Sequence, residues 1–274
     1  MDTIMKQTEL TVQKIRHTLK ARMLQVCRVT RLTPSRVRIT LTGDDLASFM
    51  SASFDDHVKV FFPATPSAKP ALPIIGPNGP TFPEGERPAA RDYTPRRYDA
   101  VAGELDIDFV LHGSGPAATW AAQATVGQYL GIAGPRGSFV VPHEFDWHLL
   151  IGDESALPAI GRRLEELPEG KRVLAVIEVP NPDAEPAFET DTDLSIQWVH
   201  CPVASSGGVG PLERVLRRLH LPDGDGYVWA AGEFAAIRGI RQYLVQEQGL
   251  DKSRIRAASY WRRGDSATHQ NFDD

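Results

Sequence analysis

The 274-residue sequence contains only two cysteines and no long run of apolar residues. The cysteines, Cys27 and Cys201, form no Cys-x-x-Cys pair and no metal-ligand cluster, so we expect two free thiols in a reducing compartment. No stretch approaches the roughly 18 apolar residues of a membrane span. Residues 1–22 also lack an apolar segment of signal-peptide length. These absences predict a cytoplasmic protein without a membrane span.

The sequence also has no excess of positively charged side chains. The 30 basic and 35 acidic side chains give a net charge of −5, which argues against nonspecific binding of nucleic acid. The sequence has no His-Glu-x-x-His motif and no order of serine, histidine and aspartate typical of a catalytic triad. We therefore predict no protein metal site and no catalytic acid or base. A local basic surface for an anionic ligand is compatible with this composition.

The first half of the chain has the pattern of a small antiparallel β-barrel. Short segments with strand character are separated by turn residues, and one helix is predicted near residues 115–124. Residues 63–90 are rich in proline and glycine, which predicts a long irregular loop. The predicted strands lie at residues 23–29, 37–41, 57–62, 105–112 and 129–132.

The pattern changes near residues 142–147. Beyond this point apolar strands alternate with helical segments, which predicts a mostly parallel sheet covered by helices. In the polar N-terminal arm, Ile15 and Leu19 are spaced as on one face of a helix. The predicted organisation is an arm (1–20), a first domain (21–145), a second domain (146–264) and a frayed tail (265–274).

One short segment, Arg91-Asp92-Tyr93-Thr94-Pro95-Arg96, combines an aromatic ring, a hydroxyl and two guanidinium groups. The ring can lie against an isoalloxazine, the hydroxyl can bind its polar edge, and an arginine can fork onto a pyrophosphate. The alternative is a packed ring with solvated charges. Context therefore has to decide whether this segment binds a flavin dinucleotide.

The motif Arg-x-Tyr-Thr-x-Arg resembles the flavin motif of the siderophore-interacting proteins, the flavin-dependent ferric-siderophore reductases. Further segments match this family in the same order, and the resemblance is to its NADPH-using ferric-chelate reductase branch in particular. It covers residues 21–264. The matching segments are Phe54–Lys59, Phe61–Pro63, Asp106–His112, Gly115–Ala117, Trp120–Ala121, Ala133–Ser138, Gly152–Ala159, Ala231–Glu233 and Tyr260–Arg262.

The resemblance implies a ferredoxin-reductase-like fold. It would have an N-terminal antiparallel β-barrel that binds FAD, followed by a C-terminal α/β domain that binds NADPH, with NADH possible. The predicted helix start at Gly115 suits a phosphate group through its free N–H groups, although an ordinary capped helix is the alternative. The residues implied for FAD are Arg91, Tyr93, Thr94, Arg96, His112, Gly115, Ala117, Ala118 and Trp120.

The nicotinamide nucleotide is assigned to the ends of strands in the second domain. Ligands of open α/β sheets bind at the carboxyl ends of strands, and Gly152 and Gly232 lie at two such ends. The Gly-x-Gly-x-x-Gly fingerprint is absent, so plain strand-to-helix turns are the alternative. The resemblance implies nucleotide contacts from Asp153, Glu154, Ser155, Gly232, Glu233 and Trp261.

The resemblance also points to Lys59, Arg136 and Arg256 as a basic triad for an anionic iron chelate. It implies an FAD-dependent ferric-siderophore reductase that passes electrons from NAD(P)H through flavin to ferric iron, with the iron held by the chelator. Two alternatives stay open: a flavin reductase that serves a ferredoxin or quinone, and a non-catalytic siderophore-binding module. The sequence does not fix the oligomeric state, and we expect a monomer.

Overall fold

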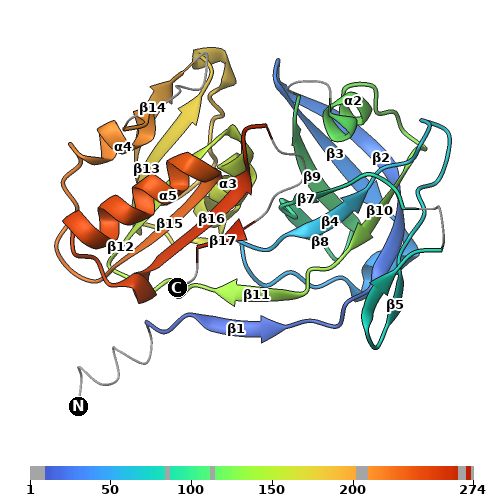
Figure 1. The fold of residues 1–274 in the computed structure, drawn as a ribbon, viewed down its shortest axis with the longest axis horizontal. Coiled ribbons are helices and arrows are strands. Elements are labelled where there is room, and N and C mark those ends of the chain that lie inside the picture. Colours follow the sequence, from blue (N-terminus) through green and yellow to red (C-terminus); the bar gives the residue numbers. More distant parts are fainter. Residues whose placement is uncertain (1–9, 84–86, 112–114, 202–208, 265–269, 273–274) are drawn as a thin grey trace. The chain divides into compact units, whose positions relative to one another are not determined.

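The computed structural model describes residues 10–83, 87–111, 115–201, 209–264 and 270–272. The described residues divide into two compact units, the first of residues 11–141 and the second of Leu10 and the residues from Pro142 onward. Each unit is built around its own sheet (Figure 1).

The first unit contains a seven-stranded sheet in the order β7-β4-β10-β2-β3-β9-β8, and every pairing in it is antiparallel. The short helix α2 (Pro116–Ala122) contacts β3 and β9, and the 3₁₀ turn η1 (Asp44–Ser48) follows β3. The strands are β2 (Ala21–Thr33), β3 (Arg36–Thr42), β4 (Val58–Phe61), β7 (Ala90–Tyr93), β8 (Arg97–Asp99), β9 (Glu104–Val110) and β10 (Tyr129–Ala133).

One hydrophobic core joins all seven strands of this sheet. Alternate residues of the central strands, such as Leu24, Ile39 and Ile107, are fully buried. Tyr93 and Tyr98 pack against the same core from the two outermost strands. A sheet whose two edges reach one core must curl, which gives the barrel-like form expected from the short strands and turns.

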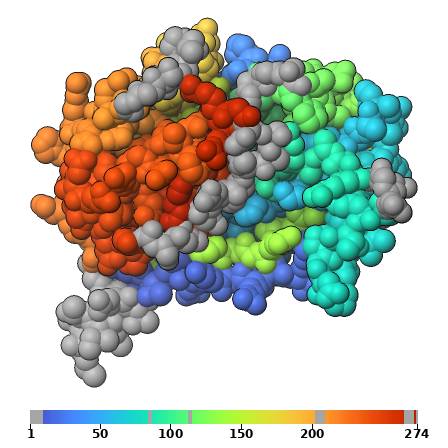
Figure 2. Space-filling model, viewed as in Figure 1, coloured from blue at the N-terminus to red at the C-terminus, as the bar shows by residue number. Residues whose placement is uncertain are grey.

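Three local predictions were wrong, and each concerns a strand of two to four residues. Residues 13–16 form strand β1 (Gln13–Arg16), paired with β11 (Gly137–Val140), rather than a helical face. All four β1 side chains are exposed, and the strand lies at the surface in Figure 2, so backbone pairing and not apolar periodicity forms it. A Cβ at Gly137 would lie 2.5 Å from the Ile15 carbonyl oxygen, so glycine permits this close approach.

The other two wrong predictions are also short pairings. Strands β5 (Ile74–Gly76) and β6 (Gly79–Thr81) form a hairpin inside the predicted irregular loop, with Gly79 at φ +101°. Strand β17 (Gln270–Asn271) adds an antiparallel edge to the second unit, within the predicted frayed tail. Pairings of two or three residues give no periodic signal in the sequence.

The second unit contains a six-stranded sheet in the order β14-β13-β12-β15-β16-β17, parallel except for β17. Its strands are β12 (Trp147–Asp153), β13 (Arg172–Val179), β14 (Asp193–His200), β15 (Gly226–Glu233) and β16 (Ile255–Trp261). Its helical segments are η2 (Glu154–Ala156), α3 (Leu157–Glu166), η3 (Pro182–Ala184), α4 (Pro211–Leu216), α5 (Phe234–Gln242), the π-helical η4 (Tyr243–Glu247) and η5 (Lys252–Arg254).

One face of this sheet packs against α4 and α5. Leu149 and Ile151 of β12 and Val176 of β13 share a buried cluster with side chains of both helices, including Leu212 and Ile237. Side chains alternate along a strand, so Asp153 and Glu178 continue the same face to the carboxyl ends of β12 and β13. The fold class predicted from the sequence is confirmed: an antiparallel barrel-like domain precedes a mostly parallel α/β domain.

Candidate functional site

In the first unit, Tyr93 stands at the end of β7 on a cluster of aromatic rings. Its ring centroid lies 4.4 Å from that of Phe109 and 6.5 Å from that of Phe62. The Trp120 ring of α2 lies 5.9 Å from Phe62 and 6.0 Å from Phe109. Burial raises the pKa of the Tyr93 phenol, which keeps it neutral. The structure thus brings the Tyr93 motif and α2 onto one aromatic platform.

The turn that follows Tyr93 is fixed by backbone contacts. Thr94 and Arg96 are buried, and the Arg96 N–H donates to the Asp106 carbonyl oxygen at 2.9 Å. Arg91 donates through Nη1 to the Ala90 carbonyl oxygen at 2.7 Å. Burial and hydrogen bonds therefore give the motif a defined backbone conformation within the domain.

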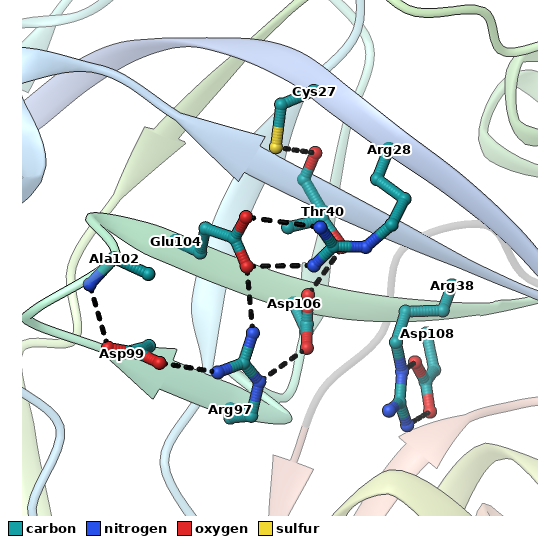
Figure 3. Close-up of polar contacts among 10 residues, drawn as sticks. All are labelled: Cys27, Arg28, Arg38, Thr40, Arg97, Asp99, Ala102, Glu104, Asp106 and Asp108. Atoms are coloured by element: carbon teal, nitrogen blue, oxygen red, sulfur yellow. Dashed lines mark hydrogen bonds and ion pairs between the residues drawn. The ribbon is translucent and has the colours of Figure 1, made fainter.

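A polar network that the sequence analysis missed holds β8, directly after the motif (Figure 3). Arg97 donates to Asp106 at 2.8 Å and to Asp99 and Glu104 at 3.0 Å, and these bonds, with that to Asp106 first, raise its pKa. Arg28 of β2 reaches past the intervening strand β3 and binds Glu104 of β9 with two hydrogen bonds. Acidic residues at positions 104, 106 and 108 share one strand face, and this spacing could have indicated the network.

The start of α2 has a backbone suited to an anion. Gly115 precedes the helix in an extended conformation, and no side chain caps the helix. The first helical bond runs from Thr119 N–H to the Gly115 carbonyl oxygen, so the N–H groups of Ala117 and Ala118 come before any such bond. A Cβ built on Gly115 would meet no atom within 4 Å, so the approach to this turn is open. His112 lies outside the described residues.

These residues fit a flavin dinucleotide. The Trp120 indole N–H is buried and has no hydrogen-bond partner among the described residues, so it can donate to an acceptor on a bound ligand. Aromatic rings, guanidinium groups and free backbone N–H groups are the donors and surfaces that a ring system with a pyrophosphate requires. All of them belong to the first unit.

In the second unit, the Asp153 carboxylate joins three strand ends. It accepts hydrogen bonds from the Ser155 N–H at 2.9 Å and from the Ser155 hydroxyl. It also accepts from the Glu233 N–H at 3.0 Å and from the Trp261 indole N–H at 2.8 Å. Gly232 has φ +153°, and a Cβ there would lie 2.6 Å from Asp153 Oδ2. Burial raises the pKa of Asp153 despite these donors.

Glu233 closes the neighbouring turn. Its carboxylate caps α5 by accepting from the N–H groups of Ala235 at 2.7 Å and Ala236 at 3.1 Å. Glu154 lies in η2, the turn that directly follows Asp153. The structure therefore brings together, at the carboxyl edge of one sheet, all six residues that the sequence analysis assigned to the nicotinamide nucleotide.

Glu178 was missed by the sequence analysis. It is in register with Asp153 on the adjacent strand β13. Burial, followed by repulsion from Asp153, raises its pKa to about 7, while Arg214 and Arg263 act in the opposite direction. Its position near the end of a strand beside Asp153 is a signal that the sequence alone could have offered.

The three predicted basic residues divide between the units. Lys59 of β4 forms an ion pair with Asp92 at 2.7 Å. Arg136 is exposed and lies three residues beyond Ala133, the last residue of β10, and Ala133 is in register with Lys59 of the neighbouring strand β4. The His17 N–H donates to the Arg136 carbonyl oxygen at 2.9 Å and thereby holds its loop. Arg256 belongs to β16 of the second unit and is 8% exposed.

Within the described ranges, no group of three or more histidine, cysteine, aspartate or glutamate residues is placed to hold a metal ion. No helix in that part of the chain combines the length and the apolar character needed to cross a membrane.

Comparisons with known proteins agree with this architecture. A sequence model of the siderophore-interacting FAD-binding domain matches residues 25–139, and one of the siderophore-interacting proteins matches residues 145–264. The chain is 38% identical to a protein of Escherichia coli named NADPH-dependent ferric-chelate reductase, over 94% of this chain and 99% of that protein. It is 35% identical to the ferric vibriobactin reductase of Vibrio cholerae, over 89% and 90%.

Solved structures give the same answer. A siderophore utilization protein from T. fusca has a TM-score of 0.85 and 40% identity, over 94% of this chain and 98% of that one. The ferredoxin reductase of a carbazole dioxygenase has a TM-score of 0.60 at 18% identity, over 87% and 69%, and supports the fold alone. The resemblance identified from the sequence is confirmed, and the chain belongs to the siderophore-interacting protein family.

Proposed function

We propose that this protein is an FAD-dependent ferric-siderophore reductase that takes its electrons from NADPH, with NADH as a second possible donor. The observation that carries the proposal is the joint presence of two sites. One is the aromatic platform of Tyr93 and Trp120 in an FAD-binding domain, and the other is the set of strand ends joined by the Asp153 carboxylate in an α/β domain. The names of the Escherichia coli and Vibrio cholerae relatives support the substrate class.

The first unit would hold the flavin. FAD would supply the capacity to accept a hydride and to release electrons singly. Tyr93 would pack against the ring system, and Thr94 with its backbone would bind the polar edge. Arg91 and Arg96 would pair with the pyrophosphate, together with the N–H groups at the start of α2.

The second unit would hold the nucleotide at the carboxyl edge of its sheet. Asp153 fixes the turns that carry Ser155 and Glu233 as well as the Trp261 indole, so these groups would present a preformed surface to the nicotinamide and its ribose. A preformed surface reduces the ordering cost of binding.

Lys59, Arg136 and Arg256 would attract an anionic ferric chelate. The chelator keeps the iron ligated, so no protein ligands to iron are required. Hard oxygen donors favour ferric over ferrous iron, and reduction therefore weakens the chelate. In this proposal the protein acts in the cytoplasm as a monomer.

The deciding experiment is anaerobic reduction of the purified protein followed by a panel of ferric chelates. We expect a yellow protein that is bleached by NADPH and reoxidised by ferric siderophores. A protein that is bleached but reoxidised only by a ferredoxin or a quinone would support the alternative reductase. A protein that binds siderophore yet retains no flavin in the presence of excess FAD would support the binding module.

A further inference from the structure

Glu178 and Asp153 are neighbours on one face of the second sheet. They are in register across the parallel strands β12 and β13, near the carboxyl end of each. Register partners in adjacent strands project to the same side, and here that side is the one covered by α4 and α5. The Asp153 carboxylate accepts four hydrogen bonds, from Ser155, Glu233 and Trp261, and the adjacent Glu178 is not among the residues that these bonds join.

Two arginines act on Glu178 from other elements. Arg214 comes from α4, and Arg263 follows β16. Arg214 is exposed, and its Nη1 donates to the Val209 carbonyl oxygen at 3.3 Å, near the start of α4. Among the described residues, the charged groups that act on Glu178 are the Asp153 carboxylate and the guanidinium groups of Arg214 and Arg263.

The chemistry at this strand end has a known meaning in dinucleotide-binding sheets. A carboxylate near the end of the second strand accepts a hydrogen bond from the adenosine ribose 2′-hydroxyl, and an arginine nearby accommodates a 2′-phosphate. β13 is the strand that follows β12 in the chain and lies beside it in the sheet. The edge therefore offers both recognition groups at once.

We propose that Glu178 and Arg214 determine which nicotinamide nucleotide this protein prefers. The proposal rests on the proposed function and assigns the choice of donor within it. Ionised Glu178 accepts from the ribose hydroxyls of NADH and repels the 2′-phosphate of NADPH, whereas Arg214 pairs with that phosphate.

A consequence is that the preference depends on pH. The pKa of Glu178 is about 7, so the carboxyl group gains its charge as the pH rises through neutrality. Preference for the 2′-phosphorylated nucleotide should fall over the same range. The 2′-phosphate has its own pKa near 6. Comparison of Glu178→Gln with the unchanged protein at each pH removes that contribution, because the nucleotide is the same in both.

The test measures binding of 2′,5′-ADP and 5′-AMP to the FAD-loaded protein by calorimetry, together with the KM for NADPH and NADH. In Glu178→Gln, we expect the ratio of affinities for 2′,5′-ADP over 5′-AMP to rise about tenfold above neutral pH and to change little below about pH 6. In Arg214→Met the ratio should fall about tenfold at every pH.

Two matched controls separate local from general charge effects. Glu169→Gln removes an exposed carboxylate just before the opposite end of β13, and Arg218→Met removes an exposed guanidinium four residues beyond Arg214. Both should leave the ratio unchanged. Far-UV circular dichroism and flavin absorbance confirm that each variant is folded and loaded.

An unchanged ratio in both Glu178→Gln and Arg214→Met would overturn the inference. The inference would also be overturned if NADPH reduces the flavin although neither the native protein nor any variant binds 2′,5′-ADP better than 5′-AMP. If neither NADPH nor NADH reduces the flavin, the proposed function fails, and that outcome is distinct because the two nucleotide fragments report on binding alone.

Discussion

At the scale of single residues, position along a strand decides which polar side chains meet. Asp153, Glu233 and Trp261 are far apart in the sequence but converge because β12, β15 and β16 run parallel and end at one edge. That convergence could be predicted, since each residue comes at or just after the end of a predicted strand. The role of Asp153 as acceptor for both Ser155 and Trp261 could not, because it depends on side-chain directions that strand patterns leave open.

The first prediction concerns the flavin motif. Changing Arg91 and Arg96 to Ala together should weaken FAD retention by about 100-fold, because two charge-assisted contacts to the pyrophosphate are lost. The far-UV spectrum should stay the same. FAD affinity is measured by fluorescence titration of the apoprotein, with Arg31→Met, a change at an exposed position of β2, as the control. Equal affinity in the double variant would remove these arginines from the site.

The second prediction concerns His148, which is 1% exposed on β12. Burial, followed by the charge of Arg163, lowers its pKa to about 2. The folded state therefore keeps this histidine neutral, while the unfolded chain takes up a proton below its ordinary pKa of 6.5. The stability of the native protein should fall as the pH drops from there, by about 2 kcal/mol between pH 7 and pH 5.

Urea unfolding at several pH values checks this prediction. His148→Gln should flatten the dependence by about that amount. The exposed His220→Gln should leave it unchanged. A His148→Gln protein with the same slope as the native protein would show that other groups dominate the acid response.

At the scale of elements, long strands with buried alternate residues could be predicted, and strands of two to four residues could not. β3 and β9 carry a run of buried residues at one face, which the sequence displays. β1, β5 and β17 are two to four residues long and are held by backbone bonds to their partners. No side-chain pattern marks such pairings, so the sequence predicted an arm, a loop and a tail.

The third prediction tests the three-residue strand β8. Arg97 holds this strand through Asp106, Asp99 and Glu104, and β8 follows the flavin motif directly. Arg97→Met should destabilise the domain by about 1 kcal/mol, as expected for a partly exposed ionic network. It should also speed amide exchange at Arg96, whose N–H is bonded to Asp106. Arg97→Lys should restore only part of the protection, because a single ammonium cannot reach three carboxylates in the same geometry.

The fourth prediction tests the pairing of β1 with β11. A Cβ at Gly137 would lie 2.5 Å from the Ile15 carbonyl oxygen, so Gly137→Ala should push the two strands apart. Amide exchange at His17, whose N–H binds the Arg136 carbonyl oxygen, should accelerate by about tenfold. Gly76→Ala is the control, because a Cβ there would meet its nearest atom at an ordinary 3.8 Å. Unchanged exchange in Gly137→Ala would mean that β1 adapts without releasing the Arg136 loop.

At the scale of the whole molecule, the order of two patterns along the chain predicted the fold. Short strands with turns precede an alternation of strands and helices, and this order produces a barrel-like unit followed by a parallel sheet. Composition adds one constraint. The chain carries a net charge of −5, so attraction of an anionic chelate has to come from local basic residues rather than from the overall field.

The last prediction follows from that constraint. Lys59 is 46% exposed at its side chain and Arg136 is exposed, so both act through water and are screened over about 8–10 Å at physiological salt. The kcat/KM for an anionic ferric chelate should therefore fall as salt rises, and that for a neutral chelate should not. Lys59→Met and Arg136→Met should each reduce the anionic value about threefold at low salt. Arg238→Met, an exposed change on α5, is the control.

The ion pair between Lys59 and Asp92 sharpens this prediction. Asp92 offsets part of the Lys59 charge at a distance of 2.7 Å. Asp92→Asn should therefore raise kcat/KM for the anionic chelate, and the gain should vanish when Lys59→Met is added, because the two changes act on one charge. Reduction of the flavin by NADPH is measured in parallel and should stay constant. If the salt response is the same for charged and neutral chelates in all these variants, encounter with the substrate does not depend on these residues.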